Sequence, residues 1–111
     1  TSDAEASRRF FQDQVGLQFV EDSAWALVFS VGGAPLRIQK VEKVPEVGYT
    51  VLGWVVDDIR MELKELAARG VVFERYPQLP QDDDGVWTTP DGAQIAWFKD
   101  PDGNTLSLTQ A

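Results

Sequence analysis

The sequence contains neither cysteine nor histidine, and these absences narrow its chemistry from the start. Without cysteine the chain has no disulfide, no thiolate metal site and no cysteine nucleophile. Without histidine it lacks the commonest metal ligand and the commonest general base. A large share of known enzyme chemistry is therefore excluded.

Basic residues and long apolar runs are also scarce. Ten Lys and Arg stand against 18 Asp and Glu, so the formal net charge of −8 repels phosphate backbones and anionic lipid headgroups. The apolar runs at about 24–31 and 51–56 are far too short for a membrane helix, and no signal segment opens the chain. We therefore expect no nucleic-acid partner, no membrane partner and a cytoplasmic location.

The chain does have enough bulky side chains for one core. Of its 111 residues, 43% are hydrophobic, and they include four Trp, two Tyr and six Phe. A chain of this length typically forms one domain, so we expect a single domain over residues 1–111.

The first half predicts one helix followed by three strands. Ser2 and Glu5 have the spacing of a capping box, which predicts a helix over about Asp3–Gln14 that ends before Gly16. A Gly32-Gly33 hairpin turn joins the last two of the three expected strands. These strands are Leu17–Glu21, Trp25–Val31 and Leu36–Val41.

The second half follows a connector at Lys43–Gly48 and opens with the apolar strand Tyr49–Val56. Asp57 or Asp58 can cap a helix that Gly70 ends, because apolar residues recur there at helical spacing, at positions 59, 63, 66 and 67. Further strands are expected at Val71–Tyr76, Val86–Thr89, Ala93–Lys99 and Thr105–Gln110, with a polar loop at Pro77–Asp84.

The order of elements suggests a weak internal duplication. Module one spans about residues 1–44 and module two about 48–111, and only the second has an opening strand before its helix.

Three segments together resemble one family across nearly the whole chain. The run Trp97–Leu108, WFKDPDGNTLSL, resembles the closing hairpin of the vicinal oxygen chelate superfamily, the glyoxalase and bleomycin-resistance fold. Val55–Ile59 is similar to the family's strand-to-helix junction. Ala6–Phe11 with Val15–Leu17 is similar to its first helix and the exit from it.

The resemblance implies an α+β fold of paired beta-alpha-beta-beta-beta modules, whose curved sheets form a cup around a ligand. The sequence begins where the family's first strand would be ending. We therefore expect the first strand to be missing from these residues and supplied by an upstream segment or by a partner chain, since sheet edges are usually covered.

Metal-using members of the family typically take ligands from the first, fifth and last strands. Carried over by motif position, the fifth-strand ligand falls on Val51 and the last-strand ligand on Ser107. Valine has no donor atom, and a neutral serine hydroxyl is a weak ligand. The resemblance therefore implies a member that lacks the metal ligands, with no cofactor and no metal-dependent glyoxalase or dioxygenase chemistry.

A cup without its metal resembles the bleomycin-binding proteins, which hold a flat or bulky molecule by stacking and burial. Our interpretation is a small-molecule binding protein for a hydrophobic or aromatic ligand, forming a homodimer. Arg37 and Gln39 alternate with Leu36 and Ile38, so one of these pairs faces the cup. The candidate ligand-binding residues are Trp25, Phe29, Arg37, Gln39, Tyr49, Val51, Gly53, Trp54, Trp87, Trp97 and Ser107.

Two other functions stay open at this point. One is a metal-independent isomerase or lyase of the same fold that uses a carboxylate or a tyrosine, with no catalytic residue assigned. The other is a structural or regulatory dimer whose cup is filled by side chains. Strand aromatics are core residues more often than ligand contacts, so the candidates are proposed as a set.

Three local motifs have ordinary structural explanations. Asp82-Asp83-Asp84 is expected to be a solvated loop, because adjacent carboxylates rarely converge on one cation. Asp100–Asn104 has the residues of a tight turn. Ser107 has no histidine or neighbouring lysine to activate it as a nucleophile.

Overall fold

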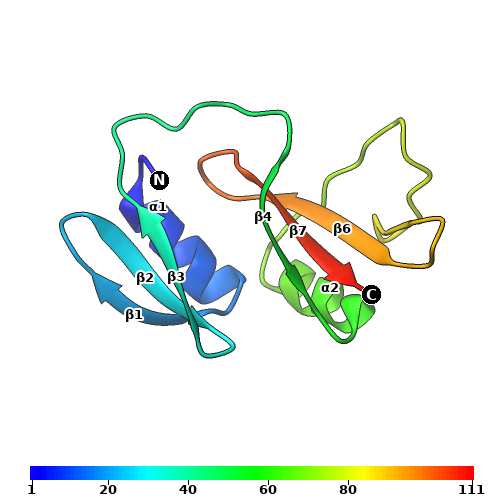
Figure 1. Cartoon of the computed structure of the whole chain (residues 1–111), viewed down its shortest axis with the longest axis horizontal. Coiled ribbons are helices and arrows are strands. Elements are labelled where there is room, and N and C mark those ends of the chain that lie inside the picture. The colour runs from blue at the N-terminus through cyan, green and yellow to red at the C-terminus, as the bar shows by residue number, and fades with distance from the viewer.

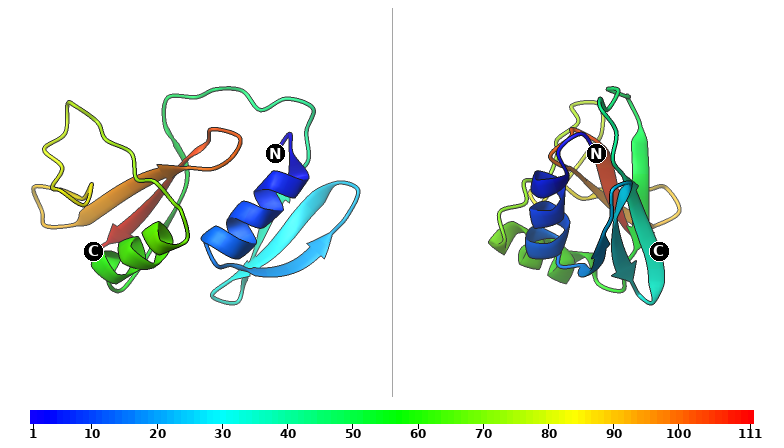
Figure 2. Two further views of the ribbon diagram at one scale, coloured as in Figure 1. Left: turned by 180° about the vertical axis from the view of Figure 1, so that it is seen from behind. Right: turned by 90° about the vertical axis from the view of Figure 1, so that its left-hand side faces the viewer.

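The computed structural model describes residues 1–111, and it places two β-sheets next to each other (Figure 1). The helical segments of both halves lie on one side of the sheets, which leaves the other side of each sheet without a covering helix (Figure 2).

The first sheet follows directly from the N-terminal helix. Helix α1 (Ala4–Arg9) continues into a π-helix, η1 (Phe10–Gln14). Three antiparallel strands then form a sheet in the order β1-β2-β3. Their bounds are Gln18–Asp22 for β1, Ala26–Val31 for β2 and Ala34–Gln39 for β3.

The second sheet has four strands in the order β4-β7-β6-β5, with β4 parallel to β7 and the other pairs antiparallel. Helix α2 (Ile59–Ala68) follows β4. The strand bounds are Thr50–Val55 for β4, Trp87–Thr88 for β5, Gln94–Lys99 for β6 and Thr105–Gln110 for β7. The predicted α+β class is confirmed, and the two sheets do not close into a barrel.

An aspartate caps the N-terminus of each α-helix. Asp58 caps α2 as predicted, because its carboxylate accepts a hydrogen bond from the Met61 amide at 3.1 Å. The capping residue predicted for the first helix was wrong. Asp3, and not Ser2, accepts from the Ala6 amide, because the amide and hydroxyl of Ser2 both donate to the Asp102 carboxylate at 3.0 Å.

The predicted strand Val71–Tyr76 was also wrong. The segment forms only an isolated antiparallel bridge, between Phe73 and Phe98. At one end the Val71 amide still donates to the Leu66 carbonyl at the helix exit, and at the other end Pro77 has no amide hydrogen to continue a ladder.

The core lies between the helices and the sheets. All six phenylalanines are in it or pack against it. Along β2, β6 and β7 alternate side chains point toward the helices and are fully or almost fully buried, such as Phe29, Phe98 and Leu108. The rings of Phe10 and Phe98, 6.2 Å apart between centroids, join the two halves.

Polar contacts also connect the two halves. The Gln14 side chain donates to the Arg69 carbonyl at 3.0 Å, and the Arg69 guanidinium donates to the Gln14 carbonyl at 2.6 Å. Strand β3 pairs with β2 alone, and Thr1 lies beside its end, donating to the Gln39 carbonyl at 2.6 Å and accepting from the Val41 amide at 2.8 Å. No helix has the length and apolar character needed to cross a bilayer.

Candidate ligand-binding site

The second sheet has one face packed on the core and one that no helix covers, which we call the open face. Side chains alternate along each strand, so the residues between the core positions project from this face. They are Gly53 and Val55 on β4, Thr105, Ser107 and Thr109 on β7, Ile95, Trp97 and Lys99 on β6, and Trp87 on β5. The register of β4 shifts between Thr50 and Leu52, so Val51 does not follow this alternation, and it lines a separate cavity.

The Trp97 ring lies next to two small residues, Ser107 and Gly53, in the middle of this face. Trp97 is directly opposite Ser107, and Ser107 is directly opposite Gly53. A Cβ atom placed on Gly53 would lie 2.3 Å from the Ser107 Oγ atom, so the serine hydroxyl occupies the space above the glycine. No large side chain therefore projects from the sheet at these two positions beside the Trp97 ring, and the surface there is nearly flat.

One cavity of about 330 Å³ opens at this face, and we call it the open-face cavity. Its size is at the lower end of the range for small-molecule sites. Four segments of the chain contribute to it: the connector with the start of β4, the α2–β5 segment, β6 and β7. The lining residues are Val47, Gly48, Tyr49, Thr50, Tyr76, Gln78, Leu79, Trp97, Lys99 and Thr105.

Aromatic rings make up much of the lining. Tyr76 meets Trp97 edge-on, with 5.4 Å between ring centroids and 82° between the planes. Trp97 in turn stacks on Trp87 at 6.3 Å and 28°. Tyr49 is 66% exposed at the cavity, so part of its ring is free to contact a ligand.

The cavity lining also includes polar groups. The Lys99 ammonium donates to the Thr105 hydroxyl at 2.9 Å. Burial, followed by the negative charge of Glu74, raises the pKa of Tyr76, while a hydrogen bond with Thr105 acts in the opposite direction. Tyr76 therefore keeps its proton at neutral pH and can donate it. None of the lining residues is a carboxylate.

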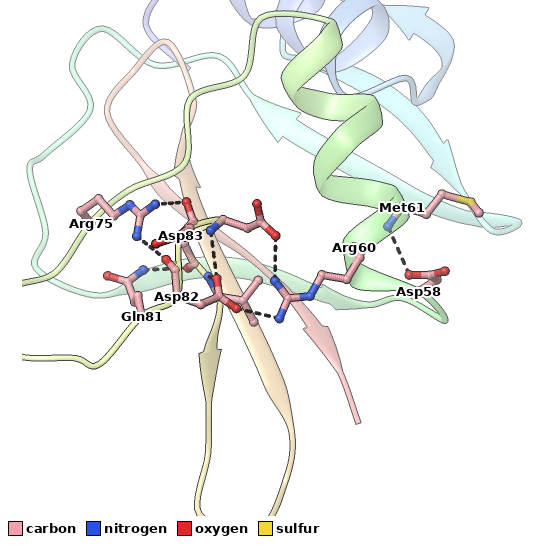
Figure 3. Close-up of polar contacts among 10 residues, drawn as sticks. Asp58, Arg60, Met61, Arg75, Gln81, Asp82 and Asp83 are labelled. Atoms are coloured by element: carbon pink, nitrogen blue, oxygen red, sulfur yellow. Dashed lines mark hydrogen bonds and ion pairs between the residues drawn. The ribbon is translucent and has the colours of Figure 1, made fainter.

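The segment between α2 and β5, which supplies Tyr76, Gln78 and Leu79, is held by hydrogen bonds. The Gln81 side chain accepts from the Tyr76 amide at 2.6 Å and donates to the carbonyls of Glu74 and Gly85 at 3.0 and 2.8 Å. The Arg75 guanidinium donates to the carbonyls of Asp82 and Asp83, as Figure 3 shows.

Arg60 on α2 also holds the segment between α2 and β5, through ion pairs. Its guanidinium forms ion pairs with Asp82 at 2.7 Å and with Asp84 at 3.0 Å (Figure 3). The hydrogen bond from Arg60, assisted by the amides of Val86 and Asp84, lowers the pKa of Asp82 despite partial desolvation. The acidic run is thus a loop, as predicted, and two of its three carboxylates pair with an arginine.

Only some of the predicted ligand-binding residues come together. Tyr49 and Trp97 line the open-face cavity. Three others lie on the same open face outside the cavity, namely Gly53, Trp87 and Ser107. Val51 lies at the register shift of β4 and lines a separate cavity of about 240 Å³.

The remaining candidates lie elsewhere. Phe29 is fully buried in the core, and Trp54 points to the helix side, where its ring meets Phe98 at 6.1 Å and 90°. Arg37 and Gln39 are the pair that faces away from the core, but on the first sheet. Trp25 is 74% exposed just before β2.

The sequence reasoning missed Tyr76 and Lys99 as cavity residues. Lys99 could have been found, because it is two residues from Trp97 on the same strand and so shares its face. Tyr76, Gln78 and Leu79 depend on the path of an irregular segment, for which the sequence has no periodic signal.

The residues at the expected metal positions do not fit a divalent ion. Ser107 lies on the open face, where its neighbours on β4 and β7 are glycine, valine and threonines, and Val51 lies apart from it at the register shift of β4. No three Asp or Glu side chains gather anywhere in a cluster that could hold a metal. The donor set offered at this face is therefore hydroxyls alone, which bind such ions weakly.

Comparison with known proteins agrees with this architecture. A crystal structure of an antibiotic binding protein from Streptomyces sp. CB03234 is 25% identical, with a TM-score of 0.70 over 99% of this chain and 88% of that one. A superfamily member from Sphaerobacter thermophilus DSM 20745 is 24% identical, with a TM-score of 0.74 over 100% and 90%. A lactoylglutathione lyase from Agrobacterium tumefaciens is 18% identical, with a TM-score of 0.71 over 100% and 87%.

No curated protein matches the sequence. The model of the Glyoxalase/Bleomycin resistance protein/Dioxygenase superfamily matches residues 1–108, which is nearly the whole chain. With the two-sheet fold and the neighbours above, this match establishes the family. The chain belongs to the glyoxalase/bleomycin resistance protein/dioxygenase superfamily.

Proposed function

We propose that this protein binds a small aromatic or hydrophobic molecule in the open-face cavity and needs no metal to do so. The observation that carries the proposal is the cavity itself, because it combines aromatic lining with a few polar donors. Apolar walls with a small number of oriented polar groups are typical of ligand sites. The similarity to an antibiotic binding protein supports the same class of function.

A metal-independent isomerase or lyase is less well supported by the chemistry of the site. A carboxylate acting as general base would have to lie in the cavity, and none lines it. Asp100 lines a separate cavity of about 240 Å³, but it accepts three hydrogen bonds within its own turn, from Asp102 and Asn104. Tyr76 has its pKa raised, which makes it a poorer base at neutral pH.

A purely structural role would require the cup to be filled by side chains. The cavity volume of about 330 Å³ and the exposed Tyr49 ring argue against that. The expected homodimer is a separate proposal, which sedimentation velocity of the purified chain would test.

The proposed function can be tested with a matched pair of exposed aromatic residues. Tyr49→Ala removes a cavity ring, and Trp25→Ala removes a ring of similar exposure outside the cavity. The protein would be treated with EDTA and titrated with 2-naphthamide, with tryptophan fluorescence and thermal shift as readouts. A ligand that favours the folded state raises its melting temperature.

We expect metal-independent binding that Tyr49→Ala weakens several-fold and Trp25→Ala leaves unchanged. Binding that requires added zinc or manganese, or equal effects of the two variants, would contradict the proposal.

A further inference from the structure

We propose that the open-face cavity selects aromatic anions, whose carboxylate or phenolate oxygen is bound by Lys99 and Tyr76 while the ring lies against Trp97. This inference rests on the proposed binding function and adds the class of ligand. It concerns the polar groups of the cavity lining, which include an ammonium group and two hydroxyls.

Lys99 has a charge that no acid in the protein neutralises. Its ammonium donates to the Thr105 hydroxyl, which uses one of three N–H donors, and it takes part in none of the ion pairs of the structure. The chain carries a net charge of −8, so acidic partners are plentiful. An ammonium left unpaired beside aromatic rings is suited to an external anion.

The neighbouring hydroxyls also offer hydrogens. Thr105 accepts from Lys99, so its own O–H is left to donate. Tyr76 keeps its phenolic proton, since burial and Glu74 both raise its pKa. The cavity therefore presents N–H and O–H donors that acceptor oxygens of a ligand can satisfy.

The aromatic part of the ligand has a place next to these donors. Trp97 and Lys99 project from the same face of β6 two residues apart, roughly 7 Å along a strand. The small residues Ser107 and Gly53 continue the row from Trp97 across the sheet. A flat ring that lies against Trp97 in the cavity has its substituent oxygen within reach of the flexible Lys99 side chain.

Two carboxylates, those of Glu74 and Asp100, could oppose the binding of an anion. Glu74 acts on Tyr76 and opposes an incoming anion, but it is not a lining residue. Asp100 follows Lys99 in the sequence, and its carboxylate accepts three hydrogen bonds within the Asp100–Asn104 turn. Lys99 is therefore the charge that a ligand in the cavity meets first.

The test compares two probes of nearly the same shape, 2-naphthoate and its neutral analogue 2-naphthamide. Both would be titrated at low ionic strength into the wild-type chain, Lys99→Met, Lys99→Arg and the control Lys64→Met, which removes an exposed lysine from α2. Charge-assisted hydrogen bonds favour the charged probe by about tenfold or more, and salt screens this preference.

We expect the wild-type chain, Lys99→Arg and Lys64→Met to prefer 2-naphthoate about tenfold, and Lys99→Met to lose this preference while still binding 2-naphthamide. Equal affinity of the wild-type chain for both probes would overturn the anion selectivity and leave the binding function standing. Failure of both probes to bind at millimolar concentration would contradict the proposed function itself.

Discussion

Ser107 and Gly53 face each other across β7 and β4 so closely that the serine hydroxyl lies where a side chain on residue 53 would begin. Ser107 is only 8% exposed, although it lies on a face that no helix covers. At this pair no large side chain therefore projects from the middle of the open face, which leaves room for a flat molecule beside Trp97.

Gly53→Ala should disturb this arrangement. The added methyl group would be 2.3 Å from the Ser107 Oγ atom, so the hydroxyl must rotate away and rise above the sheet. We expect aromatic ligands to bind several-fold more weakly, with stability lowered by about 1 kcal/mol. Isothermal titration and thermal unfolding would measure the two effects.

The double variant Gly53→Ala with Ser107→Ala is the control for this contact. Removing the hydroxyl clears the space for the new methyl group, so the double variant should recover most of the stability lost by the single one. If Gly53→Ala alone is as stable as the double variant, the contact between the new methyl group and the Ser107 hydroxyl does not lower the stability.

Trp54 is expected to be a core residue and not a ligand contact. Its ring packs edge-on against Phe98 on the helix side of β4. Trp54→Ala should therefore lower the free energy of unfolding by about 2–4 kcal/mol while the remaining folded protein binds aromatic ligands normally. Urea unfolding and a titration below the transition would separate the two.

Arg60 should control the order of the segment that supplies Tyr76 to the cavity. Arg60→Met removes both ion pairs to the acidic loop and keeps a side chain of similar length. Each of these pairs is solvent-exposed and contributes about 0–1 kcal/mol. We expect a few-fold faster hydrogen exchange at the Val86 amide, which donates to Asp82.

Arg9→Met is the matched control, because it removes an exposed ion pair from α1, on the other half of the chain. No change is expected in the acidic loop. Equal exchange in both variants would show that Arg75 and Gln81 hold the segment without help from Arg60.

The same contact has a predicted pH dependence. Arg60 holds the pKa of Asp82 below its ordinary value of 3.8 in the folded state. The stabilisation by Asp82 is therefore fully present above the unfolded-state pKa and is lost as pH falls through the lower folded-state value. Carboxyl NMR titration should show the Asp82 pKa rising in Arg60→Met.

Local signals in the sequence predicted much of the fold. The Asp58 cap, the Gly70 stop and the Asp100–Asn104 turn are chemical requirements of single positions, and the last strand, Thr105–Gln110, was predicted to the residue. The errors arose where distant groups compete. Ser2 is drawn away from the helix by Asp102, which is far from it in the sequence.

The candidate site was only partly predictable. Strand alternation places Trp97 at the open-face cavity, whereas Tyr49 reaches it from the residue before β4. Alternation could not decide that Trp54 turns to the core, since that depends on which face meets α2. The path of the segment after Gly70 decides where Tyr76 lies, and hydrogen bonds from Arg75 and Gln81 set this path. Such contacts leave no periodic pattern in the sequence.

The helices cover one side of both sheets, so the residues that hold the fold and those that line the open-face cavity are separate sets on the same strands. On β6, Ala96 and Phe98 serve the core, while Trp97 and Lys99 serve the cavity. Substitutions at the second set can change the shape and charge of the cavity without touching the packing that keeps the chain folded. This separation makes the open face a natural place for new specificities to evolve, and a practical one to redesign.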